Sequence, residues 1–229
     1  MRGYILGFLG NFYLKTFKLE KAIKYFEMAL KCNTKNVVAL YNYGIVLLQQ
    51  GNGQKALNLF EKCKVLNKKP LYEKLILLAI SSCYWKMNEI EKAIDILENL
   101  KNNYEYESPE TLTTLGYLYM LNKEYEKASN ISKKVLEKEP NYASAWDNLG
   151  QIYFFQNDFK NAKENFLKSI NLNPYSVDSL YYLGILEEQE ENREKALEYF
   201  NMAKKCKITA LNTISEEDLE QKLNSYKNF

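Results

Sequence analysis

Four cysteines carry the most reactive side chains of this chain: Cys32, Cys63, Cys83 and Cys206. No two of them form the CxxC pair that is typical of zinc and redox sites. Histidine is absent, which removes the commonest metal ligand and the commonest general base near neutral pH. Mixed Cys/His zinc sites and histidine-activated nucleophiles are therefore excluded. We interpret the cysteines as reduced, partly buried thiols of a cytoplasmic protein.

The other candidates for chemistry are carboxylates and glycines. The run "EEQEEN" (187–192) is typical of a solvated helix end, and Gly51 and Gly53 in "QQGNGQ" indicate a turn between helices rather than a phosphate loop. Because no nucleophile and base can be paired, the sequence predicts a protein that is not an enzyme and that has no cofactor and no metal.

Composition is ordinary for a soluble folded protein, with 46% hydrophobic and 26% charged residues among 229. Charge is uneven: residues 1–70 hold twelve Lys and Arg against three Asp and Glu, whereas residues 141–229 hold ten against fourteen. A basic end suits an acidic partner or a membrane surface, and solvated lysines explain it equally well. The longest apolar run (4–14) is too short to span a membrane.

The elements that position these side chains follow from a repeat. Alanine recurs at spacings of 34 to 37 residues, and self-similarity at such a period indicates a solenoid. Each repeat holds two runs with helical periodicity, separated by a short polar turn such as "QND" (156–158), so each repeat is predicted to be a helical hairpin. The recurring alanines are Ala22, Ala56, Ala93, Ala128, Ala162 and Ala196.

A glycine lies twelve residues before the alanine in all repeats except the third, which has Ser81. Glycine inside a helix costs about 1 kcal/mol relative to alanine, so it needs a reason. We expect Gly150 and Ala162 to let two antiparallel helices touch, with Tyr153 and Phe166 filling the space on either side. The glycines are Gly10, Gly44, Gly116, Gly150 and Gly184.

The repeat resembles that of the tetratricopeptide-repeat family in the size and the spacing of its residues. The residues of the fifth repeat that match the family pattern are Trp146, Leu149, Gly150, Tyr153, Ala162, Phe166 and Pro174. The resemblance implies an all-α fold, a right-handed α-α superhelix (a tetratricopeptide solenoid). Residues 1–210 would form six hairpins, at about 3–36, 37–70, 74–107, 109–142, 143–176 and 177–210. Residues 211–229 would form a C-terminal capping helix, with Ser215 as its N-cap.

In that family the first helix of each hairpin lines a concave face, and here this face is aromatic and polar. The resemblance therefore implies a non-catalytic scaffold that binds an extended peptide or a partner protein there, with Asn42 and Asn148 bonding to the ligand backbone. Chaperone-tail clamps of the family use inward cations, which are missing here. The residues expected to bind the partner are Tyr41, Asn42, Leu78, Trp85, Tyr117, Asn148, Gln151, Phe154 and Tyr181.

Two alternatives stay open at this point. The basic N-terminal part could stack head to tail on the acidic C-terminal part of another copy, giving a self-assembling structural scaffold. The chain could also be the soluble part of a membrane-anchored tetratricopeptide protein, and thus be membrane-associated, if an upstream anchor has been removed. Nucleic acid is not expected as a partner, because the inward positions hold no basic stripe.

Overall fold

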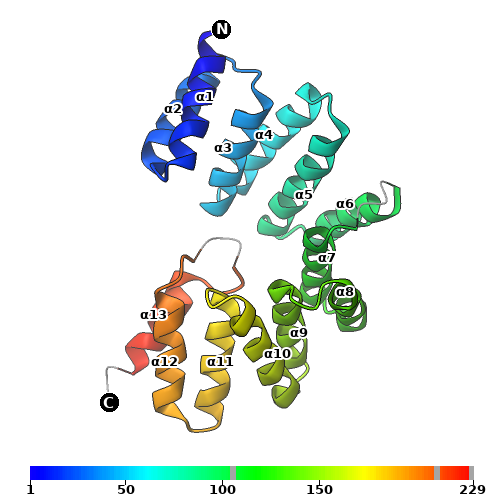
Figure 1. The fold of residues 1–229 in the computed structure, drawn as a ribbon, viewed down its shortest axis with the longest axis vertical. Coiled ribbons are helices and arrows are strands. Elements are labelled where there is room, and N and C mark those ends of the chain that lie inside the picture. The colour runs from blue at the N-terminus through cyan, green and yellow to red at the C-terminus, as the bar shows by residue number, and fades with distance from the viewer. Residues whose placement is uncertain (104–106, 209–211, 227–229) are drawn as a thin grey trace. The chain divides into compact units, whose positions relative to one another are not determined.

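The computed structural model describes residues 1–103, 107–208 and 212–226. These residues form thirteen α-helices and contain no strand, which confirms the predicted all-α fold (Figure 1). The chain divides into two compact units, Met1–Leu100 and Lys101–Phe229, which we call unit 1 and unit 2.

Unit 1 consists of three consecutive helix pairs, and its first helices α1, α3 and α5 pack side by side (Figure 1). The hydroxyl of Ser81 on α5 donates to the Ala93 carbonyl of α6 at 2.9 Å, which joins the third pair. The helices are α1 (Arg2–Lys15), α2 (Leu19–Lys31), α3 (Val37–Gln49), α4 (Gly53–Leu66), α5 (Pro70–Lys86) and α6 (Ile90–Asn103), of which the last crosses the unit boundary.

Unit 2 repeats this arrangement, because α7, α9 and α11 also lie side by side and each pairs with the helix that follows it (Figure 1). A thirteenth helix packs on α12. The helices are α7 (Pro109–Leu121), α8 (Tyr125–Lys138), α9 (Ala143–Phe155), α10 (Phe159–Leu172), α11 (Val177–Gln189), α12 (Arg193–Lys204) and α13 (Glu216–Ser225).

The turn inside each hairpin has one geometry. Its second residue adopts a left-handed backbone, and the next amide closes the helix; for example, Asp158 N donates to the Tyr153 carbonyl at 2.9 Å. This is the Schellman arrangement, which satisfies carbonyls at a helix end. It recurs whatever the residue type, so the turn is imposed by the packing of the two helices. The left-handed residues are Phe17, Gly51, Asn88, Lys123, Asn157 and Glu191.

The recurring glycines make room for an aromatic ring. A Cβ on Gly150 would lie 2.5 Å from Cδ1 of Phe166, and a Cβ on Gly44 would lie 2.6 Å from Cε1 of Phe60, distances that atoms do not adopt. The predicted closeness of the two helices is thus correct, but the group nearest to Gly150 is the Phe166 ring rather than Ala162. A ring lying flat over a helix backbone needs more room than a methyl group, which explains why glycine is required.

Two repeats show what replaces this pair. In the fourth repeat Ser132 stands where the ring would be, and a Cβ on Gly116 would lie 3.3 Å from the Ser132 hydroxyl oxygen, a tight contact that a shift of a few tenths of an ångström relieves. In the third repeat Ser81 replaces the glycine and buried Leu97 replaces the ring. Wherever a ring is present, a glycine lies sixteen residues before it; the fourth repeat keeps the glycine without a ring, and the third has neither.

Helix α13 begins with a reciprocal cap. The Ser215 hydroxyl accepts the Asp218 amide at 3.1 Å, while the Asp218 carboxylate accepts the Ser215 amide at 2.7 Å. Ser215 is therefore the N-cap that the sequence predicts. Leu219 and Leu223 are buried in the core shared with α11 and α12, and Lys204 pairs with Glu220 at 2.8 Å.

Candidate functional site

The inner face of unit 1 is the surface of its first helices that carries Asn11, Tyr41, Asn42, Leu78 and Trp85. All of these side chains except Asn11 were expected to bind a partner, and all five are half-buried. The Tyr41 ring lies 5.5 Å from the Phe60 ring, and the Asn42 amide donates to the Asn11 side-chain oxygen at 2.9 Å. This contact joins α1 to α3 and leaves the Asn42 oxygen available as an acceptor.

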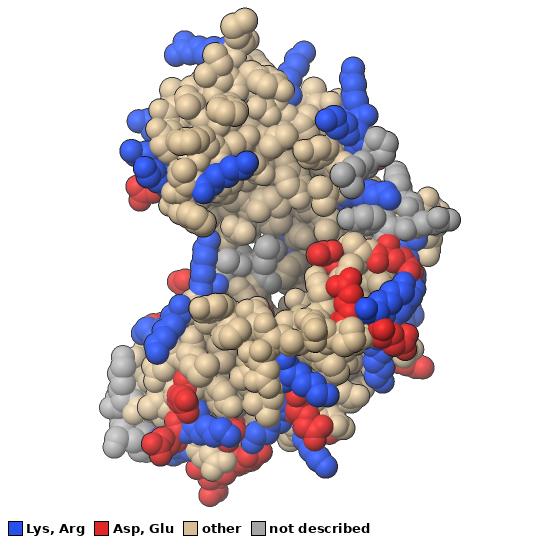
Figure 2. Space-filling model, in the orientation of Figure 1, with Lys and Arg blue, Asp and Glu red and all other residues tan. Residues whose placement is uncertain are grey.

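Charge is sparse in this part of the surface. The Lys86 ammonium lies 4.1 Å from the centre of the Trp85 ring, a cation–π contact that holds the indole in place. On the visible side of unit 1, basic side chains stand around a broad uncharged area (Figure 2). The inner face of unit 1 thus combines rigid aromatic area with amide groups.

The inner face of unit 2 carries Tyr117, Asn148, Gln151, Phe154 and Tyr181, and it is more closed. Asn148 is buried and donates to the Thr113 carbonyl of α7 at 2.8 Å. Gln151 is 1% exposed. The ring of Phe154 packs on Tyr182 at 4.8 Å, and the ring of Tyr181 packs on Phe200 at 5.6 Å.

A segment of the chain itself contacts this face. The hydroxyl of Thr213 lies 2.9 Å from the Tyr117 hydroxyl and donates to the Gln151 side-chain oxygen at 3.2 Å. One oxygen of Asp178 accepts both the Thr213 amide, at 3.0 Å, and the Ile214 amide, at 3.1 Å. The sequence analysis did not find this contact, because nothing in a turn sequence indicates which surface the turn lies on.

Two carboxylates stand together at this point. Asp147 accepts the Gln151 amide at 2.7 Å and also accepts the Ser179 hydroxyl. Burial, and next the charge of Asp178, raise the pKa of Asp147 to about 7, although both hydrogen bonds favour the charged form. Burial likewise raises the pKa of Tyr117. The inner face of unit 2 thus carries two neighbouring carboxylates among partly buried side chains, in contrast to that of unit 1.

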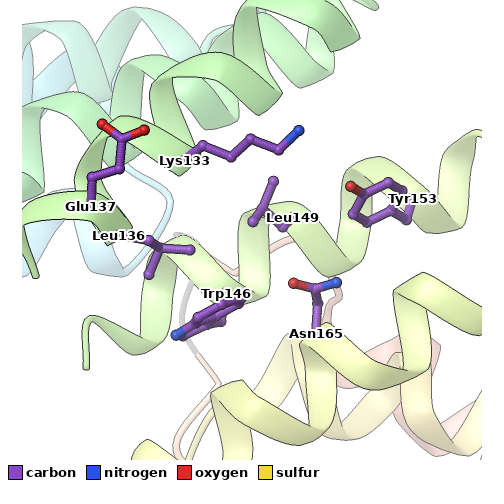
Figure 3. Close-up of a pocket in the computed structure, with 7 residues that line it drawn as sticks. All are labelled: Lys133, Leu136, Glu137, Trp146, Leu149, Tyr153 and Asn165. Atoms are coloured by element: carbon purple, nitrogen blue, oxygen red, sulfur yellow. The ribbon is translucent and has the colours of Figure 1, made fainter. Parts of the chain in front are cut away.

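A pocket of about 460 Å³ lies elsewhere on unit 2, between α8, α9 and α10 (Figure 3). The indole nitrogen of Trp146 donates to the Pro140 carbonyl at 2.8 Å, and the Lys168 ammonium lies 4.2 Å from the ring centre. The repeat pattern assigns Trp146, Leu149 and Tyr153 to packing, so the sequence did not indicate a pocket there. Its walls are Lys133, Leu136, Glu137, Trp146, Leu149, Tyr153 and Asn165.

Apart from the pair of Asp147 and Asp178, the described part of the chain offers little for metal binding or nucleophilic chemistry. It holds no group of three or more Cys, Asp or Glu side chains placed to bind a metal. Burial raises the pKa of the Cys63 and Cys83 thiols to about 12, which keeps them protonated and poorly nucleophilic. Among the described helices, none combines the length and the hydropathy that crossing a bilayer demands.

Comparison with protein families divides the chain as the structure does. Residues 15–100 match the family described as anaphase-promoting complex, cyclosome, subunit 3. Residues 109–142 and 143–176 each match the tetratricopeptide repeat, with the bounds that the sequence analysis assigns to the fourth and fifth repeats.

Individual proteins resemble the chain at low identity. A BBSome complex member BBS4 homolog of Drosophila melanogaster is 26% identical over 73% of this chain and 34% of its own length. The Hsp70-Hsp90 organising protein of Plasmodium falciparum is 29% identical over 72% of this chain and 28% of its own. The chain therefore spans about a third of these relatives.

A solved structure shares the fold over nearly the whole chain. A tetratricopeptide repeat protein of Parabacteroides merdae superimposes with a TM-score of 0.81, covers 97% of this chain and 83% of its own, and is 18% identical. At 18% identity, the likeness shows that the two proteins share a fold.

Proposed function

Because the chain belongs to the tetratricopeptide-repeat family, we propose that it is a non-catalytic scaffold for protein–protein interaction, which binds an extended peptide or a partner protein on its inner faces. The family supports an interaction scaffold in general. That the inner faces are the binding surface is our own assignment.

The observation that carries the proposal is that two aromatic side chains on the inner face of unit 1 are held in place by neighbours and are still partly exposed. Tyr41 and Trp85 are anchored by ring and cation contacts yet stay half-exposed. Aromatic side chains held in this way lose little conformational entropy when they bind, and they are common as interface hot spots. Asn42 adds a hydrogen-bond acceptor for a peptide backbone.

The experiment is selection of peptides from a random display library with the full chain, followed by affinity measurement. The double variant Tyr41→Ala/Trp85→Ala should lose at least about tenfold in affinity for the selected peptides. Val65→Ala is the matched control, because Val65 is 84% exposed on the second helix α4 and lies outside the inner face. It should change affinity less than twofold or so.

A tryptophan reporter makes this test independent of the library. The chain has two tryptophans, so Trp146→Phe leaves Trp85 as the single indole. Bound peptide should shift or quench its emission. Peptides that bind the double variant and the control equally well, and leave the Trp85 emission unchanged, would show that the inner face of unit 1 is not the binding surface.

A second function, self-association, is favoured by the exposed side of α1. Ile5 and Phe12 are 56% and 52% exposed, whereas the equivalent Ala39 and Val46 of α3 are buried. In α3 these positions face the preceding helix pair, and none of the described helices covers the corresponding side of α1. We propose that a second copy of the chain covers this apolar side of α1.

Light scattering over a concentration series tests the second function. Association through α1 should persist at high salt, because the surface is apolar, and Ile5→Ser/Phe12→Ser should abolish it. Dispersal by salt would instead favour the electrostatic head-to-tail stacking of basic and acidic ends. A constant monomer mass would rule out both.

A further inference from the structure

The connection between α12 and α13 is longer than a turn between helices requires. It runs over residues 205–215, whereas residues 173–176 suffice between α10 and α11. Connections between packed helices usually run over roughly 2–8 residues. Residues 212–214 of this connection, which we call the inserted segment, are the ones that touch the inner face of unit 2.

The inserted segment is held mainly by polar contacts. The Thr213 hydroxyl lies between Tyr117 and Gln151, and two successive backbone amides converge on Asp178. The Asn212 amide also donates to Asp178, at 3.3 Å. The side chain of Ile214 is 5% exposed and belongs to the core that α11, α12 and α13 share. The inserted segment thus makes its contacts through bent backbone amides, one hydroxyl group and one aliphatic side chain.

The contacts also define what the surface recognises. Two successive amides can reach one carboxylate oxygen only where the backbone bends, in the manner of an anion-binding nest. Here the anion, Asp178, belongs to the receiving surface. The surface therefore suits a bent, amide-donating segment. It does not suit a carboxyl terminus or an acidic peptide, because Asp147 lies beside Asp178.

The capping helix is held partly by contacts outside the inserted segment. Lys222 pairs with Glu188 at 2.5 Å, and the Tyr226 hydroxyl donates to Glu188 at 2.9 Å. Leu219 and Leu223 lie in the same core as Ile214, so departure of the inserted segment would remove one side chain from that core. The polar contacts of the segment with the inner face can break while the Glu188 contacts keep α13 on α11.

We propose that the inner face of unit 2 is a recognition site for a bent peptide segment in which a Thr or Ser precedes an aliphatic residue. Residues 212–214 occupy this site as a tethered ligand, and a partner protein with a similar segment displaces them. The inference rests on the proposed use of the inner faces for partner binding, and it assigns the ligand class and the regulation of unit 2. A tethered ligand acts at an effective concentration that reaches the millimolar range, so a partner must bind well to compete.

The experiment uses the full chain and a fluorescein-labelled synthetic peptide, KITALNTIS, which has the sequence of residues 207–215. Fluorescence anisotropy should show weak binding to the wild-type chain. The variant Thr213→Ala/Ile214→Ser weakens the contacts of the tethered segment. It should bind the peptide at least about tenfold more tightly, because the peptide then displaces a weakly bound segment. The same peptide with Thr213→Ala should lose that gain.

Two further variants locate the binding. Asp178→Asn, added to the weakened variant, should remove the gain, because the peptide amides lose the negative charge of their acceptor and the new NH2 group donates where a carboxylate oxygen accepted. Glu164→Gln, at an exposed position of α10, should leave it unchanged. A weakened variant that binds no more tightly than wild type, or a gain that survives Asp178→Asn, would overturn the proposal.

A second measurement covers the case in which the weakened variant folds poorly, which circular dichroism would reveal. In the wild-type chain, a saturating concentration of the unlabelled peptide should speed hydrogen exchange of the Ile214 amide at least about fivefold, since the amide leaves Asp178. Unchanged exchange would mean that the peptide does not displace the segment, and the proposal would be wrong. Neither result depends on Tyr41 or Trp85, so the proposed function in unit 1 is judged separately.

Discussion

The inner faces of the two units are built on the same repeat, and their middle repeats differ in what stands three residues before the recurring glycine. In the second repeat that residue is Tyr41, which packs on Phe60 and stays half-exposed. In the fifth repeat it is Asp147, which needs hydrogen-bond donors and lies beside Asp178. Tyr181 of unit 2 holds the same position in the sixth repeat and packs on Phe200 much as Tyr41 packs on Phe60, so the difference lies in the carboxylate of the fifth repeat and in the segment that covers the face beside it.

The largest expected effect on stability comes from the contact between the recurring glycine and the aromatic ring, which both units share. Gly150→Ala should lower stability by about 1–3 kcal/mol, because the new methyl group would overlap the Phe166 ring and outweigh the gain in helix propensity. Gly44→Ala in unit 1 should behave in the same way. The midpoint of urea unfolding measures both.

Gly116→Ala is the control for this effect, because its methyl group would meet no ring: it would lie 3.3 Å from the Ser132 hydroxyl oxygen and 3.5 Å from the Ala128 carbonyl oxygen and from Cγ2 of Ile131. It should be neutral or stabilising by up to about 1 kcal/mol. Equal destabilisation by all three substitutions would mean that the glycines serve backbone freedom rather than the fit of the ring.

Much of this framework can be predicted from the sequence. The period of the alanines and glycines indicates stacked hairpins, because each small residue marks one helix crossing, and Ser215 with Asp218 marks the start of α13. The ring as the partner of the glycine is harder to predict, because Ala162 and Phe166 lie one turn apart on the same side of α10 and both are buried.

The closure of unit 2 was not predictable for a different reason. Thr213 and Asp178 are far apart in the sequence and belong to no periodic pattern, so only tertiary structure brings them together. For the same reason the raised pKa of Asp147 cannot be predicted from the sequence, because it depends on burial and on the neighbouring carboxylate. Periodicity predicts which side a residue faces and does not predict what covers it.

The acidity of unit 2 predicts a pH dependence. The pKa of Asp147 is raised to about 7 from 3.8, so the folded state binds the proton more tightly than the unfolded chain. The stabilisation is therefore complete below about pH 4 and is lost as the pH rises through about 7. Unit 2 should lose on the order of 1–3 kcal/mol of stability between pH 5 and pH 8.

Fluorescence of Trp146 in a Trp85→Phe background, followed during urea unfolding, reports this loss in unit 2. Asp147→Asn should flatten the dependence, because the amide resembles the protonated acid and can donate to the Ser179 hydroxyl. Asp95→Asn, at an exposed position of α6, should leave it as in the parent. If Asp147→Asn kept the full slope, another group would be responsible for the titration.

The smallest expected effect compares two asparagines at equivalent positions. Asn148→Ala should cost about 1–2 kcal/mol, because it leaves the buried Thr113 carbonyl without the amide that donates to it at 2.8 Å. Asn42→Ala should cost less than about 0.5 kcal/mol, because Asn11 is half-exposed and water can replace the lost donor. Peptide binding should respond in the opposite order, with Asn42→Ala weakening the affinity of peptides selected on unit 1 and Asn148→Ala leaving it unchanged. Should Asn42→Ala destabilise the chain as much as Asn148→Ala while peptide affinity stays constant, Asn42 would be a packing residue, and the two inner faces would differ less than their surfaces suggest.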